Sequence, residues 1–347
     1  MDFKEFKEQI SQDILGELPE KYKKADINFE LVEKLQGQSY EGMVIRPQGS
    51  QIGVSINLEE QHNLMNEGST YDEVLDNIVD IAIVGIEKTP QVDVVNLADY
   101  EQVKGKLMVE LVGTERNQKR LSHIPHTEVE DMSAVYRANA GEAGGGMATV
   151  LITNEMLNHY GVSVEQLHQD AIENAAQTMP ANFRSMNQVL NEMMGNAGME
   201  LDMGADPLYV LSNDRNMKGA SAILYPDVMK NCAEQLEGNF YVLPSSVHEV
   251  LLVPESFGMS RKELEGMVSS VNSDEVTPEE QLTDHVYHYD AKDKVFELAE
   301  KYEKRMASKE KETTKSVLKS LEGKKNECKE KTDGKIHEGK KRVSPER

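Results

Sequence analysis

A short polar segment between two apolar runs contains the residue types best suited to chemistry. Residues 244–249 read Pro-Ser-Ser-Val-His-Glu, and Asn213 and Asp214 end an apolar run upstream. A hydroxyl nucleophile, an imidazole base and a carboxylate are the groups of a nucleophilic hydrolase. One hypothesis is therefore a hydrolase with its site near Asp214, Ser246, His248 and Glu249, with Ser245 as the alternative nucleophile.

The surroundings of these residues favour a second interpretation. The Gly-x-Ser-x-Gly pattern that places a serine on a strained turn before a helix is absent. Neighbours in sequence do not define a triad, which is recognised by its geometry in space. Polar residues in the turn of a β-hairpin explain the same segment, and we expect no catalytic site from it.

Metal and phosphate motifs are incomplete. His248 and Glu249 begin like a zincin motif, but position 252, one helical turn after His248, is Leu. The glycine-rich segment 141–146 is followed by neither Lys nor Ser/Thr at the phosphate-loop spacing, so we interpret it as a hairpin loop. The sequence therefore predicts no cofactor.

Histidines occur in two H-x-x-H pairs and on one helical face. His123 with His126, and His285 with His288, have a spacing that aligns ligands on a helix but sends them to opposite faces of a strand. Both pairs lie in loop or strand context, so a metal site is not favoured. His168 falls on an apolar helical stripe, where a packed, hydrogen-bonded histidine and a ligand or pH-sensing role remain the two alternatives.

Charge divides the chain into an acidic body and a basic tail. Residues 300–347 contain 16 Lys or Arg and 10 Asp or Glu, which leaves 22 basic and 51 acidic residues, a net charge of −29, in residues 1–299. Such a body repels nucleic acid and anionic membranes. Contact with nucleic acid is expected only through the tail, and weakly, because Tyr302 is its only aromatic residue. The leading hypothesis is a non-catalytic binding or regulatory protein that meets an unknown protein partner through its acidic surface.

Cysteine usage and hydropathy indicate the cellular setting. Cys232 and Cys328 are the only cysteines, which fits a reducing cytosol rather than a disulfide framework. The N-terminal residues lack a basic segment followed by an apolar core, and the longest apolar run, 81–86, is too short to cross a bilayer. We therefore expect a cytoplasmic protein that is not inserted in a membrane.

Apolar periodicity predicts an α+β fold with mixed or antiparallel sheets and packed amphipathic helices. Four capping patterns mark helix starts: Thr70 with Glu73, Ser163 with Gln166, Ser260 with Glu263, and Thr277 with Glu280. Predicted helices are 2–18, 71–82, 97–103, 164–176, a helix from Pro226 to Leu236, and one after each of the last two caps. Predicted strands are 27–35, 40–47, 51–58, 106–112, 129–138, 147–153, 208–212, 240–243, 250–253, 285–290 and 295–296.

The densest structural signal lies in residues 207–254, which read as a strand, a helix and a hairpin. We expect residues 1–299 to form one contiguous unit, with any sub-boundary near 115–125. Residues 300–347 are Lys/Glu-rich and are expected to be a helical or disordered tail.

Several segments, taken together, resemble a bacterial family of unknown function. They are IPHTEVEDMSAVYRAN, ATVLITNEMLNHYGVSVEQLHQDAIENA, GASAILYPDVMKNCAEQLEGNFYVLPSSVHEVLLVPE and TPEEQLTDHVYHYD. The family is encoded by Gram-positive gut bacteria, often near mobile elements, and is distantly similar to the YtpQ-like family. The resemblance covers about residues 1–295. It implies a bacterial cytosolic protein with one α+β unit and assigns no catalytic residues.

Overall fold

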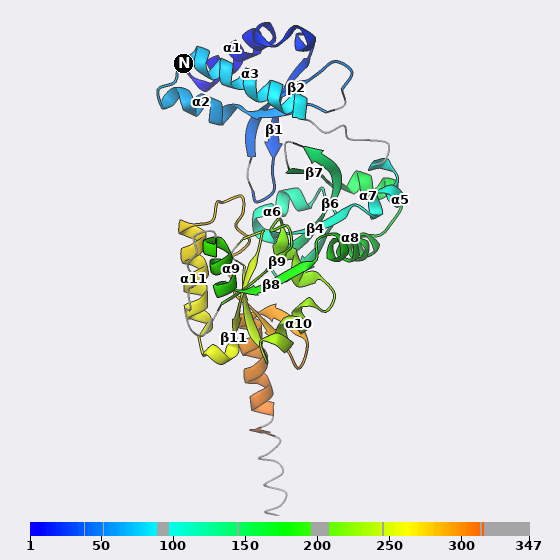
Figure 1. Cartoon of the computed structure of the whole chain (residues 1–347), viewed down its shortest axis with the longest axis vertical. Helices are drawn as coiled ribbons and strands as arrows, with labels where there is room; N and C mark the ends of the chain where they lie inside the picture. The colour runs from blue at the N-terminus through cyan, green and yellow to red at the C-terminus, as the bar shows by residue number, and fades with distance from the viewer. Residues whose placement is uncertain are drawn as a thin grey trace, which may run out of the picture.

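The protein has an α+β architecture built from antiparallel sheets. In this computed structural model, the residues described are 1–37, 39–50, 52–88, 97–143, 146–195, 208–244, 246–312 and 314–315. Within these ranges the strands form three antiparallel sheets with helices packed on them (Figure 1), which confirms the predicted class. No helix in the described part of the chain is long and apolar enough to cross a membrane.

Residues 1–88 build a three-stranded sheet with its own hydrophobic core. The core joins Phe6 and Ile10 of the first helix to Met43 and Ile45 of the central strand and Ile78 of the last helix. The elements are α1 (Phe3–Glu17), β1 (Asp26–Glu33), β2 (Ser39–Arg46), β3 (Val54–Asn57), α2 (Leu58–Asn66) and α3 (Tyr71–Lys88). The predicted helices and strands of this region are confirmed, and α2 was missed.

The reason for the missed helix is local. Asn57 is both the last residue of β3 and the N-cap of α2, where its side chain accepts hydrogen bonds from the N–H groups of Glu59 and Glu60. Strand and helix therefore join without a loop, and the strand pattern hides the start of the helix.

The second sheet is organised around the long strand β6, which pairs with β4 on one edge and with β5 and β7 on the other. Helix α6 was not predicted because only Asn117 and Leu121 of it are buried, so it has no apolar stripe. The elements are α5 (Tyr100–Lys104), β4 (Leu107–Gly113), α6 (Thr114–Leu121), β5 (His126–Val129), β6 (Met132–Ala143), β7 (Gly146–Leu151), α7 (Asn154–Tyr160) and α8 (Val164–Thr178).

The third sheet has six antiparallel strands in the order β13-β12-β10-β11-β9-β8. Its core is continuous with that of the second sheet, since one cluster of buried apolar side chains runs from Val103 to Tyr289. The elements are β8 (Ala181–Ser185), α9 (Met186–Gly195), β9 (Tyr209–Asn213), η2 (Gly219–Leu224), α10 (Val228–Gln235), β10 (Phe240–Leu243), β11 (Val250–Pro254), η3 (Glu255–Phe257), α11 (Arg261–Asp274), β12 (Tyr287–Asp290) and β13 (Val295–Leu298).

Two predicted helix starts are wrong. Helix α10 begins at Val228 rather than Pro226, because Asp227 has a left-handed backbone with φ of 60°. Thr277 caps no helix: its carbonyl accepts from the N–H groups of Glu280 and Gln281 in an isolated turn. No apolar stripe follows that turn, so nothing would bury a helix there.

A buried ion cluster connects the second sheet to the third. The carboxylate of Glu110, on β4, is only 3% exposed and lies 2.5 Å from Arg137 Nε and 2.7 Å from Lys218 Nζ. Burial alone would raise the pKa of Glu110, but the two cations lower it below its usual range. Lys218 itself adopts a left-handed backbone between β9 and η2.

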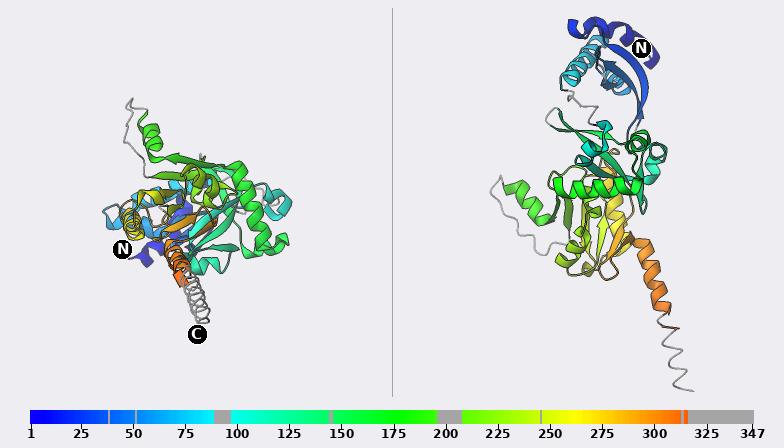
Figure 2. Two further views of the ribbon diagram at one scale, coloured as in Figure 1. Left: turned by 90° about the horizontal axis from the view of Figure 1, so that it is seen from below. Right: turned by 90° about the vertical axis from the view of Figure 1, so that its right-hand side faces the viewer.

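A helix over residues 299–312 follows β13 and leaves the body at the end opposite to the N-terminal unit (Figures 1 and 2). Its first turns are docked: Tyr302 is buried, and Arg305 binds three carboxylates of the body. The Arg305 guanidinium donates to Glu297 at 2.7 Å, Asp293 at 2.7 Å and Asp290 at 2.9 Å. The start of the Lys/Glu-rich segment is thus held on the third sheet.

We predict that Arg305→Ala lowers the free energy of unfolding by about 3 kcal/mol, because Asp290 and Glu297 are largely buried and would lose their counter-ion. The matched control is Lys304→Ala, whose ion pair with Glu300 is exposed and contributes below about 0.5 kcal/mol. Urea denaturation of both variants measures the difference. Equal, small effects would show that the Arg305 cluster does not hold the helix.

Candidate functional site

The N-terminal unit is attached to the second sheet by a reciprocal amide contact. The N–H of Gln36, at the β1–β2 turn, donates to Asn117 Oδ1 at 2.6 Å, and Asn117 Nδ2 donates back to Gln36 Oε1 at 2.9 Å. Both side chains are buried, and Lys119 adds an ion pair with Glu33. This attachment fixes the β1–β2 hairpin against α6.

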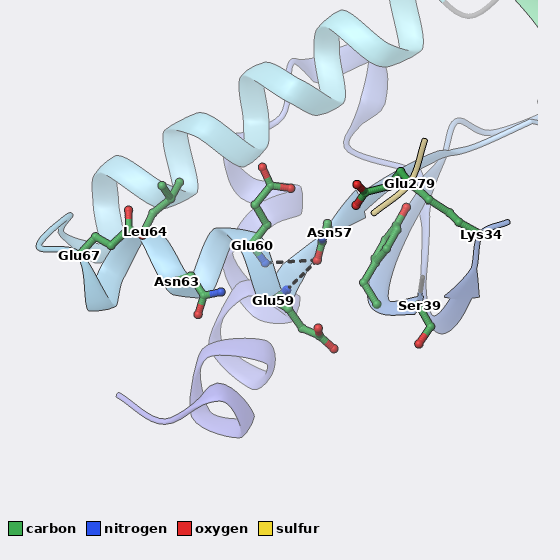
Figure 3. Close-up of a pocket in the computed structure, with 10 residues that line it drawn as sticks. Lys34, Ser39, Asn57, Glu59, Glu60, Asn63, Leu64, Glu67 and Glu279 are labelled. Atoms are coloured by element: carbon green, nitrogen blue, oxygen red, sulfur yellow. Dashed lines mark hydrogen bonds between the residues drawn. The ribbon is translucent and has the colours of Figure 1, made fainter. Parts of the chain in front are cut away.

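Beside the hairpin lies a pocket of about 440 Å³ (Figure 3). Helix α2 forms one wall, the hairpin forms another, and Glu279 of the turn at 277–280 completes the lining. The lining residues are Lys34, Ser39, Tyr40, Asn57, Glu59, Glu60, Asn63, Leu64, Glu67 and Glu279. We call this the acidic pocket.

The acidic pocket has the chemistry of a cation site. Its carboxylates Glu59, Glu60, Glu67 and Glu279 are exposed, and they outnumber its single cation, Lys34. The Lys34 ammonium lies 5.1 Å from the centroid of the half-buried Tyr40 ring, a cation–π distance. The walls of the pocket therefore already accommodate one ammonium group, that of Lys34. A concave surface with an aromatic side chain and several carboxylates also suits an ammonium group from a ligand.

The predicted hydrolase residues do not form a hydrogen-bonded triad in the part of the chain that is described. His248 Nδ1 accepts from the backbone N–H of Lys218 at 3.3 Å, and its Nε2 lies 3.4 Å from Glu280 Oε1. Ser246 Oγ accepts from the backbone N–H of His248 at 3.0 Å, not from its ring. Both ring nitrogens are thus directed at groups other than a serine hydroxyl.

The remaining residues of that hypothesis are dispersed. Asp214 is exposed in the turn after β9, and its backbone N–H donates to the carbonyl of Pro180. Asn213 is buried and stabilises the same turn through Met217. Glu249 leads into β11, and Ser245 lies outside the described residues.

The polar turn is hydrogen-bonded to the turn that carries Glu279. The backbone N–H of Val247 donates to the carbonyl of Glu280 at 2.8 Å, so residues 246–248 hold the turn that carries Glu279. Gly219 is packed beneath: a Cβ there would lie 2.6 Å from the carbonyl oxygen of His248. The segment singled out from the sequence therefore contacts the turn that supplies Glu279 to the acidic pocket.

A second polar cluster gathers around Asp131, between β5 and β6. Its carboxylate accepts hydrogen bonds from His285 Nδ1 at 2.7 Å, from Thr283 Oγ1 at 2.9 Å and from the Tyr287 hydroxyl. Burial acts to raise the pKa of Asp131, but these hydrogen bonds lower it below its usual range. Asp131 and His285 line a pocket of about 520 Å³ at the start of α6, which we call the His285 pocket.

The two histidines of this H-x-x-H pair differ completely in environment. The His285 side chain is 63% exposed, whereas His288 is fully buried and stacked on Tyr302 with ring centroids 3.5 Å apart. The nearest acid to His288 Nε2 is Glu255, at 3.6 Å, beyond hydrogen-bond distance. In the described ranges, no three His, Cys, Asp or Glu side chains form a group that could hold a metal ion.

His168 is half-buried and hydrogen-bonded. Its Nδ1 lies 3.0 Å from the hydroxyl of the buried Tyr136, which also contacts Thr127 Oγ1 at 2.6 Å. Burial lowers the pKa of His168. The contacts agree with the packed, hydrogen-bonded alternative. In the pair His123 and His126, His126 Nδ1 lies 3.1 Å from the carbonyl oxygen of Ile124.

Sequence reasoning missed several residues of both pockets. Lys34, Tyr40 and Glu279 lie in three separate segments of ordinary polar composition, and Asp131 is one of many acidic residues. Glu279 did lie in a segment predicted to start a helix, and His285 in a histidine pair. No signal in the sequence pointed to their partners.

Comparison with known proteins identifies the family. A model described as "Family of unknown function (DUF5688)" matches residues 3–291. The chain belongs to this family. The predicted resemblance to a family of unknown function, with nearly the same coverage, is thereby confirmed. Origin in Gram-positive gut bacteria and similarity to the YtpQ-like family stay predictions. No curated protein and no solved structure matches the chain.

We predict a pH-dependent stability that originates at His288. Burial lowers the pKa of its imidazole, while the acids Glu255, Asp290 and Glu297 oppose the effect only partly. Below about pH 6.5, His288 therefore binds a proton in the unfolded chain but not in the folded chain. The free energy of unfolding consequently decreases as the pH is lowered.

Replacing His288 by Phe should flatten this loss between about pH 7 and pH 5, as measured by urea denaturation at each pH. The exposed His159, at the end of α7, gives the control variant His159→Gln, which should keep the wild-type dependence. The same slope in wild type and His288→Phe would refute the assignment.

Proposed function

We propose that this protein is a binding protein that takes a basic segment of a partner protein on its acidic surface. In this proposal the acidic pocket receives one lysine or arginine side chain of the partner. The observation that carries it is the pocket itself, whose lining combines four exposed carboxylates with the Tyr40 ring, a known type of surface for cations.

The charge of the whole body supports the same choice of partner. Residues 1–299 have a net charge of −29, so a basic partner is attracted and nucleic acid is repelled. Helix α3 adds a solvent-exposed acidic row at helical spacing, Asp72, Asp76 and Asp80. The long-range field would bring the partner to the surface, and the pocket would fix its register.

The walls of the pocket come from two parts of the chain. Glu279 belongs to a turn fixed by Val247 and His248, whereas the other walls come from the N-terminal unit. A ligand in the pocket would contact both parts of the chain and stabilise their arrangement. We further infer a bacterial, cytoplasmic setting, which the free and buried Cys232 supports.

The test is fluorescence anisotropy with a labelled lysine-rich peptide, titrated with the full-length protein at graded salt. We expect binding that weakens as salt rises, and none with the acetylated peptide, whose charge is lost. The double variant Glu67→Gln/Glu279→Gln should weaken binding about fivefold, since each exposed ion pair contributes roughly 0.5 kcal/mol.

The charge-matched control is Asp76→Asn/Asp80→Asn, which removes the same two charges from α3, away from the pocket. The affinity of this control variant for the peptide should stay closer to the wild-type affinity than that of the pocket variant does. Equal weakening by both double variants would mean that the peptide senses net charge and that the pocket is not the site. Failure of the unmodified peptide to bind at low salt would refute the proposed function.

A further inference from the structure

The His285 pocket contains an imidazole held in one orientation with one nitrogen available. The 2.7 Å contact with Asp131 Oδ2 places a proton on His285 Nδ1, because an ionised carboxylate only accepts. Nε2 then has a lone pair. None of the described residues makes a hydrogen bond or ion pair to Nε2, and the ring lines the pocket.

The carboxylate that orients this ring is itself fixed. Thr283 and Tyr287 donate to Asp131, and its backbone carbonyl accepts from the N–H of Thr114 at 3.0 Å. The aspartate thus has no freedom to turn away from His285. This is the arrangement by which a carboxylate orients a catalytic histidine and stabilises the imidazolium that forms.

The start of α6 also lines the pocket. Arg116 is exposed there and forms no ion pair within the described part of the chain. The helix begins at Gly113 without a side-chain cap, so the N–H groups of Glu115 and Arg116 are not satisfied by a capping side chain. A guanidinium in such a wall suits a substrate that carries a negative charge.

The hydroxyl groups of the pocket are committed elsewhere. Thr114 Oγ1 is hydrogen-bonded to Ser133 Oγ at 2.8 Å, and Thr283 Oγ1 donates to Asp131 and lies 3.3 Å from His285 Nδ1. Neither is positioned on His285 Nε2 as a nucleophile would be. The group that Nε2 can activate is therefore water.

We propose that the His285 pocket is a hydrolytic site for small, anionic carboxylic esters, with His285 as the general base. Nε2 takes a proton from water while the water oxygen bonds to the ester carbonyl carbon, and the carbonyl electron pair moves to its oxygen. The tetrahedral intermediate then breaks its bond to the alcohol oxygen, which takes the proton from imidazolium. The products are a carboxylic acid and an alcohol, and His285 is returned neutral.

In this scheme Arg116 binds the charge of the substrate, the N–H groups at the start of α6 face the developing oxyanion, and Asp131 is a positioning residue. The site is separate from the acidic pocket, although both draw residues from the segment between Thr277 and Tyr287. Its failure would leave the proposed binding function intact.

The test compares the full-length protein and its variants on two p-nitrophenyl esters, the neutral acetate and the anionic hemisuccinate. His285→Gln should lower kcat/KM about 10²-fold or more, the usual contribution of a general base. Exposed imidazoles also react with such esters, so the control is His159→Gln on α7, which should keep the wild-type rate. Equal rates for wild type, His285→Gln and His159→Gln would overturn the proposal.

Two further variants separate the roles of the other residues. Arg116→Gln should raise KM for the hemisuccinate and leave the acetate unchanged, and equal effects on both esters would overturn the anionic specificity. Asp131→Asn should lower kcat for both esters and leave KM unchanged, because the carboxylate acts on the imidazole and not on the substrate. A raised KM with an unchanged kcat would contradict the positioning role of Asp131. The other charged residues that line the pocket are Glu115, Arg116 and Asp284, and Glu300 interacts electrostatically with His285.

Discussion

The contact between Lys218 and Glu110 is the constraint on which most of the structure depends. A carboxylate buried on β4 needs a cation, and Lys218 supplies one in addition to Arg137. To do so the lysine adopts a left-handed backbone, which turns its N–H toward His248 Nδ1. His248 in turn faces Glu280, so a single buried charge fixes the turn that ends beside Glu279.

The N-terminal unit depends on a smaller contact of the same kind. Asn117 and Gln36 exchange two hydrogen bonds in a buried place, where an unpaired amide would be costly. Because Asn117 also donates to the carbonyl of Gly113, the same residue fixes the start of α6. The acidic pocket and the His285 pocket therefore share their supports, which are α6 and the segment from Thr277 to Tyr287.

The sequence predicted elements well where a local signal decides them. The capping boxes at Ser163 and Ser260 each start a helix, α8 and α11, because a side-chain oxygen satisfies a free N–H regardless of the rest of the fold. The apolar stripe behind Thr70 likewise became α3. The prediction failed at Thr277, where the same pattern lacks an apolar face, and at α6, which is held by Asn117 rather than by apolar packing.

The candidate sites show the same difference between what local sequence signals determine and what tertiary contacts determine. Charge composition by itself determined the acidic body, and periodicity determined the α+β class, because both are sums over local residues. Only the tertiary structure decided which polar groups meet. Asp131 and His285 are 154 residues apart, and neither is unusual in its own segment. The sequence drew attention to His248, which has a serine and a glutamate beside it, but the fold gives that ring structural partners. A catalytic or binding site depends on distances between side chains, and those are fixed by strand pairing and buried contacts that no local pattern records.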